Sequence, residues 1–211
     1  MTERHAFAPL VLAARGLVVG RGGLALAREL DFSVGTGRCL LLRGANGAGK
    51  STLLLTLAGI VSPLGGSFAL SGAEPDSGPL LHYCGHRNAI KPRLTVLENL
   101  AFWAHINGPT GKLPDDALDI VGLGAIASLD AGYLSAGQGR RLALARLLVT
   151  ARPLWLLDEP TAALDAAGHE LVGRLIDDHL AVGGMVIAAT HDPLSPADAS
   201  RVETLVMGRA Q

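Results

Sequence analysis

The chain has 211 residues, 49% of them hydrophobic and only 4% aromatic, so its core must be built from aliphatic side chains. Eighteen lysines and arginines stand against nineteen aspartates and glutamates, and the net charge of −1 gives no basic excess that would indicate sequence-independent nucleic-acid binding. No apolar stretch approaches the roughly 18–20 residues that cross a bilayer. The length suits one α/β unit with a small insertion, and we expect a single domain over residues 1–211.

The N-terminal part contains short apolar runs that glycines separate. Runs at 10–12, 16–19 and 30–34 are divided by Gly20, Gly22 and Gly23, which predicts a β part that we expect to be antiparallel. Segment 7–19 also resembles the apolar core of a signal peptide, but a charged residue and a glycine interrupt it. We interpret it as a strand and expect a protein of the cytosol or of the periphery of a membrane.

The next segment joins a strand, a glycine-rich turn and a helix. The apolar run 39–42 is typical of a strand buried on both faces, and the leucine-rich run 51–58 predicts a helix that ends at Gly59. The turn between them matches G-x-x-x-x-G-K-[ST], and its residues are Gly44, Ala45, Asn46, Gly47, Ala48, Gly49, Lys50, Ser51 and Thr52.

This turn has the features of a polyphosphate site. Backbone N–H groups and a helix N-terminus converge on one point, where both favour negative charge. Lys50 is predicted to reach the β- and γ-phosphates, and Ser51 to ligate Mg²⁺. The alternative is a chance glycine-rich turn with a surface lysine, but the strand and the helix flank the motif as the mechanism requires. We therefore expect the chain to bind a nucleoside triphosphate.

The rest of the chain alternates strands with helices. Runs 66–70 and 79–84 predict strands, residues 87–150 are largely helical, and Thr95 and Glu98 have the spacing of a capping box. Within the helical region, breaks at 109–114 separate a helix over 115–121 from the preceding one, and an amphipathic helix is predicted over 138–150. Later segments predict a strand at 154–157, a helix at 167–182 and a strand at 185–189. This alternation predicts an α/β fold with a mostly parallel sheet and a helical insertion at about 87–150.

Two acids follow the strand at 154–157. Because ligands of open α/β sheets bind at the carboxyl ends of the strands, Asp158 and Glu159 are expected to face the nucleotide. Asp158 is placed to hold Mg²⁺, and Glu159 to orient or deprotonate the attacking water. The alternative role for both is to cap the next helix. His191 follows the strand at 185–189 in the same way and is predicted to contact the γ-phosphate, although a lone histidine is commonly structural or solvated.

A second helix N-terminus carries a further candidate site. Ser135 and the backbone amides of Ala136 and Gly137, followed by Gln138, open the helix predicted at 138–150 and face outward. Since the chain already has one phosphate-binding turn, a second anion site is explained if two copies pair head to tail. Each copy would then complete the nucleotide site of the other.

These motifs resemble, in order, those of the ATP-binding cassette (ABC) superfamily, over nearly the whole chain. The phosphate-binding turn, the helical insertion, 134–138 as the "LSGGQ" element, Asp158 with Glu159, 163–165 as the D-loop, and His191 all have counterparts there. The resemblance implies a P-loop NTPase core, ATP and Mg²⁺ as cofactors, a homodimer of the ATPase subunit and an integral membrane partner. A P-loop kinase or GTPase would leave 134–138 and His191 unexplained.

Two positions depart from the usual ABC pattern. The family usually has a glutamine that touches Mg²⁺ and the membrane partner in the loop after strand 79–84, where this chain has Gly85 and His86. His86 is thus a candidate for the metal site. The position at which the family usually stacks adenine on an aromatic ring matches Arg21, whose guanidinium can also stack on a base.

The region around the first departure resembles the CcmA family, the ABC ATPases of bacterial cytochrome c maturation. Segment 85–92, segment 94–103 and the Ser-Ala-Gly sequence at 135–137 carry this resemblance. It implies a peripheral subunit on the cytoplasmic face of the bacterial inner membrane, bound to a CcmB-like membrane subunit and associated cytochrome c maturation proteins. ATP hydrolysis would be tied to release of a haem-loaded chaperone. The alternatives are the ATPase of another ABC transporter and a soluble ABC ATPase acting on nucleic acid or ribosomes, which the charge disfavours.

Three further features have two interpretations each. Cys39 and Cys84 lie in apolar runs, and we expect buried free thiols of a reducing compartment. His82, Cys84 and His86 alternate along one strand, but a metal or haem site there is disfavoured because His86 leaves the strand. The segment 95–106, which carries two aromatic residues at 102 and 103, either contacts the membrane partner or packs inside the insertion.

Overall fold

A five-stranded parallel sheet forms the centre of the fold, and the computed structural model describes residues 7–74, 77–192, 194 and 198–208. The strand order is β5-β6-β7-β3-β8, and every neighbouring pair is parallel. The strands are β3 (Cys39–Arg43), β5 (Leu81–Cys84), β6 (Leu154–Asp158), β7 (Met185–Ala189) and β8 (Val202–Val206). Because the strands are parallel, their carboxyl ends lie together at one end of the sheet, where the predicted nucleotide-binding motifs begin.

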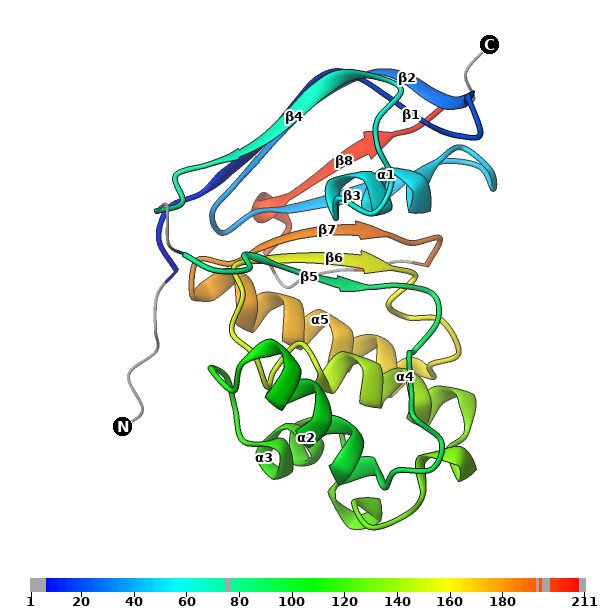
Figure 1. The fold of residues 1–211 in the computed structure, drawn as a ribbon, viewed down its shortest axis with the longest axis vertical. Coiled ribbons are helices and arrows are strands. Elements are labelled where there is room, and N and C mark those ends of the chain that lie inside the picture. Colours follow the sequence, from blue (N-terminus) through cyan, green and yellow to red (C-terminus); the bar gives the residue numbers. More distant parts are fainter. Residues whose placement is uncertain (1–6, 75–76, 193, 195–197, 209–211) are drawn as a thin grey trace.

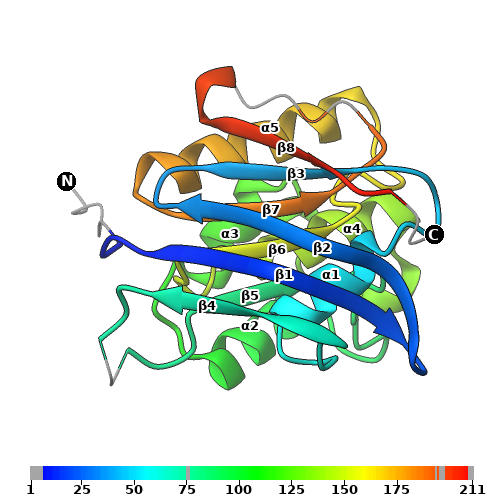
Figure 2. The ribbon, with the colours of Figure 1, turned by 90° about the horizontal axis from the view of Figure 1, so that it is seen from above.

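A smaller antiparallel sheet covers one face of this sheet, as predicted for the N-terminal part. Its strand order is β2-β1-β4. The strands are β1 (Val11–Arg21), β2 (Leu24–Gly35) and β4 (Gly65–Ser71). The first helix, α1 (Lys50–Leu57), lies between the two sheets (Figures 1 and 2). The runs 10–12 and 16–19 belong to one strand, which continues through a bulge at Gly16, where φ is 53°.

The other face of the parallel sheet is covered by the remaining α-helices (Figure 1). These are α2 (Val96–Asn107), α3 (Pro114–Ile120), α4 (Ala136–Ala145) and α5 (Ala166–Ala181). Short 3₁₀ turns at Gly124–Ile126 and Ala131–Tyr133 connect α3 to α4, and a third, Ala199–Arg201, precedes β8. Within the described ranges, no helix combines the length and the apolar character needed to cross a bilayer.

The alternation of side chains along the central strands separates two cores. In β6, Trp155 and Leu157 pack against the helical insertion and α5, whereas Leu154 and Leu156 pack against α1 and the antiparallel sheet. All four are at most 4% exposed. Successive residues of a strand face opposite sides of the sheet, so a strand covered on both faces is an uninterrupted apolar run. This is why the runs 39–42, 154–157 and 185–189 were recognisable as strands.

The capping box at the start of α2 is confirmed. The Thr95 hydroxyl accepts from the Glu98 amide at 3.1 Å, and the Glu98 carboxylate accepts from the Thr95 amide at 2.8 Å. Pro114, predicted as a break, instead begins α3, where its missing N–H costs no helical hydrogen bond.

The helix predicted over 138–150 ends earlier than expected, at Ala145. The amides of Leu147 and Leu148 bond to carbonyls three residues back, a tightened turn that closes the helix. The Leu148 carbonyl then accepts from Lys112 and the Val149 carbonyl from Gly111, at 2.8 and 3.2 Å. Segment 146–150 therefore pairs with a distant part of the insertion rather than continuing the helix.

Candidate functional site

The glycine-rich turn takes the backbone geometry that its motif predicts. Gly49, immediately before α1, has φ 92°, a left-handed conformation that non-glycine residues rarely adopt. Gly44 has φ 145°, and a Cβ there would lie 2.3 Å from the Met207 carbonyl oxygen. These constraints hold the turn against the carboxyl ends of β3 and β8, with the N-terminus of α1 open to a phosphate.

Lys50 lies within the turn that it is predicted to serve. Its ammonium donates to the carbonyl oxygens of Gly44, at 2.8 Å, and Ala45, at 3.2 Å. The same nitrogen lies 3.2 Å from Nε2 of His191. Lys50 and His191 come from sequence segments 141 residues apart, so the fold brings these two predicted phosphate-binding residues into contact.

Asp158 and Ser51 also meet. The Ser51 hydroxyl donates to a carboxylate oxygen of Asp158 at 2.9 Å, and Asp158 is 4% exposed. A hydroxyl and a carboxylate beside a polyphosphate site are the oxygen ligands that Mg²⁺ prefers. The fold therefore brings the two side chains predicted for Mg²⁺ within hydrogen-bonding distance of each other.

Glu159 occupies a strained backbone conformation next to this pair. Its φ is 49°, which is unusual for a residue with a side chain. Its amide donates to the Ala189 carbonyl at 2.8 Å, and its carboxylate accepts from the His191 amide at 3.2 Å. The side chain thus stays beside His191 at the carboxyl ends of the parallel strands. Strain of this kind is typical of functional sites.

One cavity of about 560 Å³ collects the phosphate-binding turn, Glu159 and His191. Two predicted residues, Arg21 and His86, instead line a neighbouring cavity that shares Ser51 and also contains Asp158. His86 therefore lies in the same cavity as both proposed Mg²⁺ ligands. Arg21 is exposed at the end of β1, and Leu26 of β2, which we did not predict, lines the phosphate cavity.

Arg43 and Asp192 support His191 and were not predicted. The Arg43 guanidinium donates to the carbonyl oxygens of Thr190 and Asp192 at 2.8 and 2.9 Å, and the Asp192 carboxylate accepts from the Thr161 hydroxyl at 3.0 Å. Together these contacts hold the turn that carries His191. No sequence motif marks them, because they join β3 to segments more than a hundred residues away.

The candidate second anion site lies at the start of α4. Ser135 is the N-cap, and its hydroxyl accepts from the Gln138 amide at 3.2 Å, while the Gln138 side chain accepts from the Ser135 amide at 2.9 Å. Gln138 therefore stabilises the helix terminus. Ser135, Gly137 and Gln138 line a cavity of about 540 Å³ that is separate from the cavity of the phosphate-binding turn.

Gly137 also allows α4 to approach the D-loop. A Cβ at this position would lie 2.9 Å from the Ala163 carbonyl oxygen, and Ala163 itself has φ 63°. Next to them Arg141 pairs with Asp165 at 3.2 Å, and Asp165 caps α5 by accepting from the Gly168 amide. The segments 135–138 and 163–165 therefore form one surface.

The aromatic pair of α2 packs with two cations. Phe102 and Trp103 are half-buried and meet edge to face, with ring centroids 5.4 Å apart. The Lys91 ammonium lies 4.2 Å from the Phe102 ring centroid, and the Arg146 guanidinium lies 3.8 Å from that of Trp103. Arg146 also lines the cavity that contains His86.

The three alternating side chains around β5 do not form a metal site. His82 is buried and bonds to the Thr150 carbonyl at 2.8 Å, Cys84 is buried in the core beside the helices, and His86 is exposed. Among the described residues no group of three metal-ligating side chains is found. Cys39 and Cys84 are both buried free thiols, as expected.

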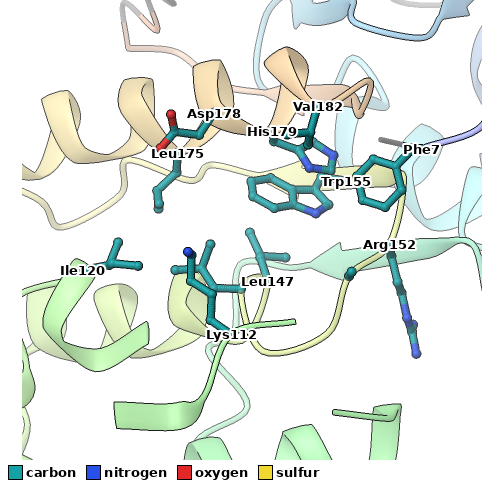
Figure 3. A pocket seen from close by; sticks show the side chains of 12 residues that line it. Phe7, Lys112, Ile120, Leu147, Arg152, Trp155, Leu175, Asp178, His179 and Val182 are labelled. Atoms are coloured by element: carbon teal, nitrogen blue, oxygen red, sulfur yellow. The ribbon is translucent and has the colours of Figure 1, made fainter. Parts of the chain in front are cut away.

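A further cavity, of about 280 Å³, lies at the opposite end of the parallel strands, near the beginning of β6 (Figure 3). Its walls are largely apolar and include Trp155, Leu147 and Leu175. His179 stacks on the Trp155 ring with centroids 3.8 Å apart and is held by the Pro153 carbonyl at 3.1 Å. None of the nucleotide-binding motifs reaches this cavity.

Two buried histidines near this cavity are expected to make the fold less stable in acid. Burial lowers the pKa of His179 to about 4, and burial with the nearby Arg152 and Arg146 lowers the pKa of His82 to about 4. In the unfolded chain both would titrate near 6.5, so below that pH only the unfolded state gains protons. We expect each histidine to cost about 2 kcal/mol of stability between pH 7 and pH 5. The loss should level off below about pH 4, where the folded state also binds the protons.

Urea unfolding at a series of pH values tests this expectation. The His179→Gln variant should lose roughly half of the dependence on pH between 7 and 5, because the new side chain does not titrate. His105→Gln, a change of an exposed histidine in α2, is the matched control and should keep the wild-type slope. An unchanged slope in His179→Gln would show that this histidine does not control acid stability.

Comparison with known proteins is consistent with this site. The ABC transporter family model matches residues 27–162. The cytochrome c biogenesis ATP-binding export protein CcmA of Rhodopseudomonas palustris (strain BisB5) is 52% identical over 189 residues, which cover 88% of this chain and 94% of that protein. A protein of the same name from Chelativorans sp. (strain BNC1) is 50% identical over 87% of this chain and 92% of its own length.

A solved structure has the same fold. An ABC transporter ATP-binding protein from Pyrococcus furiosus superposes with a TM-score of 0.78 over 92% of this chain and 97% of that one, at 24% identity. The match to the family model over residues 27–162 and the relatives at about 50% identity lead to one conclusion. The chain belongs to the ABC transporter family, as an ATP-binding subunit with ABC-type ATPase activity.

Proposed function

We propose that the chain is the ATP-hydrolysing subunit of a membrane ABC complex for c-type cytochrome biogenesis. The observation that carries this proposal is the similarity to relatives named CcmA, which are 46–52% identical to this chain and are matched over 91–94% of their own length. The proposed nucleotide-binding domain spans residues 1–211, with its helical insertion at about 87–150. The geometry of the phosphate cavity supports the ATPase part of the proposal independently of the names.

Each residue of the site has a proposed role in ATP hydrolysis. Lys50 neutralises charge on the β- and γ-phosphates, and the amides of 44–52 bind them. Ser51 and Asp158, whose side chains are 2.9 Å apart, would hold Mg²⁺, which would offset the charge that develops on the phosphates. Glu159 accepts a proton from the attacking water or orients it, and His191, beside both Lys50 and Glu159, contacts the γ-phosphate.

Two copies are proposed to close head to tail around ATP. This proposal is supported by the separation of the two candidate anion sites: the phosphate-binding turn and the start of α4 line different cavities of one chain. In the closed dimer, Ser135 and the amides at the start of α4 would face the γ-phosphate held by the turn of the other copy. The contact between Gly137 and Ala163 would place the D-loop at the same boundary.

The proposed partners are a CcmB-like integral membrane subunit and associated cytochrome c maturation proteins. The chain would bind them as a peripheral subunit at the cytoplasmic face of the bacterial inner membrane, and hydrolysis would drive release of a haem-loaded chaperone. His86 lines one cavity with Ser51 and Asp158, and it is proposed to transmit the state of the Mg²⁺ site to the surface that contacts the membrane partner. Phe102 and Trp103 are half-buried, and the Trp103 ring lies against Arg146; both are proposed to contribute to the partner contact. Arg21 is the proposed adenine-stacking residue.

Isolation of the membrane partner tests this assignment. The chain carrying an affinity tag should retain a CcmB-like subunit when purified from detergent extracts of membranes, because Phe102 and Trp103 of its helical insertion are proposed to contact that subunit. An untagged strain processed in parallel is the control for non-specific adsorption. Recovery of a different permease in stoichiometric amount would instead identify the chain as the ATPase of another ABC transporter.

A further inference from the structure

A buried arginine of α4 joins three separate parts of the candidate site. Arg140 is 2% exposed, although its guanidinium always carries a positive charge. No acidic side chain pairs with it in the described part of the chain. Burying a charge without compensation is costly, so the groups around the guanidinium must supply that compensation.

Backbone carbonyl oxygens of residues 158–160 provide most of the compensation for the buried charge. Nη2 of Arg140 donates to the carbonyl oxygens of Asp158, at 2.7 Å, and Glu159, at 2.8 Å. Nε donates to the carbonyl oxygen of Pro160 at 3.2 Å. Three consecutive carbonyls can converge on one planar group only if the chain turns sharply, and Glu159 has the left-handed φ of 49° at that point. The arginine therefore stabilises the strained conformation of Glu159.

The remaining donor binds the loop that carries His86. Nη1 of Arg140 donates to the Gly85 carbonyl at 2.8 Å and to the Asn88 side-chain oxygen at 3.1 Å. These two residues flank His86. A single guanidinium thus connects the turn of Glu159 to the loop of His86 from inside the protein.

The third part is α4 itself. Arg140 lies one helical turn beyond Ala136, so the residues at the N-terminus of this helix and the guanidinium move together. Ser135 and the following amides form the surface proposed to meet the ATP of the second copy. Any rigid shift of α4 on closure must therefore act on the backbone of Glu159 and on the loop of His86.

We propose that Arg140 is a positioning residue that links closure on ATP to the placement of Glu159 and to the His86 loop. This inference rests on the proposed role of Glu159 in hydrolysis. Arg140 does not line the phosphate cavity, so it acts through the backbone that it holds. Lysine cannot replace it fully, because an ammonium has three donors around one point, whereas the planar fork here serves five oxygen atoms.

Steady-state ATPase kinetics of the complex purified with its membrane partner test this role. Arg140→Met should lower kcat at least tenfold and change the KM for Mg-ATP less than threefold, because the phosphate-binding turn is left intact. Arg140→Lys should give an intermediate kcat. Arg174→Met, which removes an exposed arginine of α5, is the matched control and should retain the wild-type kcat. Because an unfolded fraction would lower the apparent kcat without raising KM, kcat is calculated from the concentration of nucleotide-binding sites titrated in the same preparation.

A double variant separates this inference from the proposed function. If Arg140 acts through Glu159, Arg140→Met should reduce single-turnover hydrolysis less than threefold in a Glu159→Gln background. A wild-type kcat in either folded Arg140 variant, or a full tenfold additional loss in that background, would overturn the inference. If Arg140→Met does not fold, Arg140→Lys decides, since it keeps the charge and the aliphatic stem. Full turnover in Glu159→Gln alone would count against the proposed catalytic role of Glu159 and not specifically against Arg140.

Discussion

Glu159→Gln is expected to bind Mg-ATP with wild-type affinity and to hydrolyse it at least about 100-fold more slowly. The amide cannot accept a proton from water, and general-base catalysis is worth about 10²–10⁴ in rate. Lys50 and the phosphate-binding turn do not depend on the Glu159 carboxylate, since the Lys50 ammonium bonds to the carbonyl oxygens of Gly44 and Ala45. Nucleotide binding and single-turnover hydrolysis measured on the same preparation would separate the two effects.

The same variant should accumulate as an ATP-bound dimer. If each copy completes the site of the other, a protein that binds ATP without hydrolysing it stays closed, and size-exclusion chromatography with Mg-ATP should show a dimer. Adding Ser135→Arg should return it to a monomer, because the larger side chain fills the surface at the start of α4. Ser67→Arg, at an exposed serine of β4, is the matched control and should leave the dimer intact. A Glu159→Gln variant that stays monomeric with Mg-ATP would argue against head-to-tail closure.

Lys50→Ala should impair nucleotide binding as well as hydrolysis, unlike Glu159→Gln. It removes the ammonium that is proposed to neutralise the phosphates, and loss of one such group commonly costs about 10²–10³ in rate. It also removes the two hydrogen bonds that tie the side chain to the turn. We expect nucleotide affinity to fall at least tenfold and ATPase activity to be undetectable. Lys112→Ala, at an exposed lysine outside the phosphate cavity, should retain both.

The parts of this fold that the sequence predicts are those that depend on local pattern. Buried strands such as β6 are continuous apolar runs, and the start of α2 is specified by Thr95 and Glu98 alone. The final strand, β8, was missed because it lies at the edge of the sheet. All five of its residues are half-exposed or exposed, and they alternate irregularly between apolar and polar, so its pairing with β3 leaves no clear pattern.

The candidate site likewise contains residues that the sequence predicts and one that it does not. Lys50, Ser51, Asp158 and His191 belong to motifs whose chemistry can be inferred from residue type and spacing, and the structure brings them together. The supporting arginine Arg140 has no such mark. Its role follows from five oxygen atoms that converge only after the insertion has folded onto the sheet, and no spacing in the chain encodes that convergence.

Haem staining of denaturing gels tests the proposed function most directly, since only covalently attached haem remains with the polypeptide. Membranes from a strain whose sole copy carries Lys50→Ala should lack all stained c-type cytochrome bands, while non-covalent haem proteins persist in absorption spectra. The Lys112→Ala strain should show the wild-type bands. Normal c-type bands in the Lys50→Ala strain would contradict the assignment to cytochrome biogenesis, and the chain would then be the ATPase of another transporter.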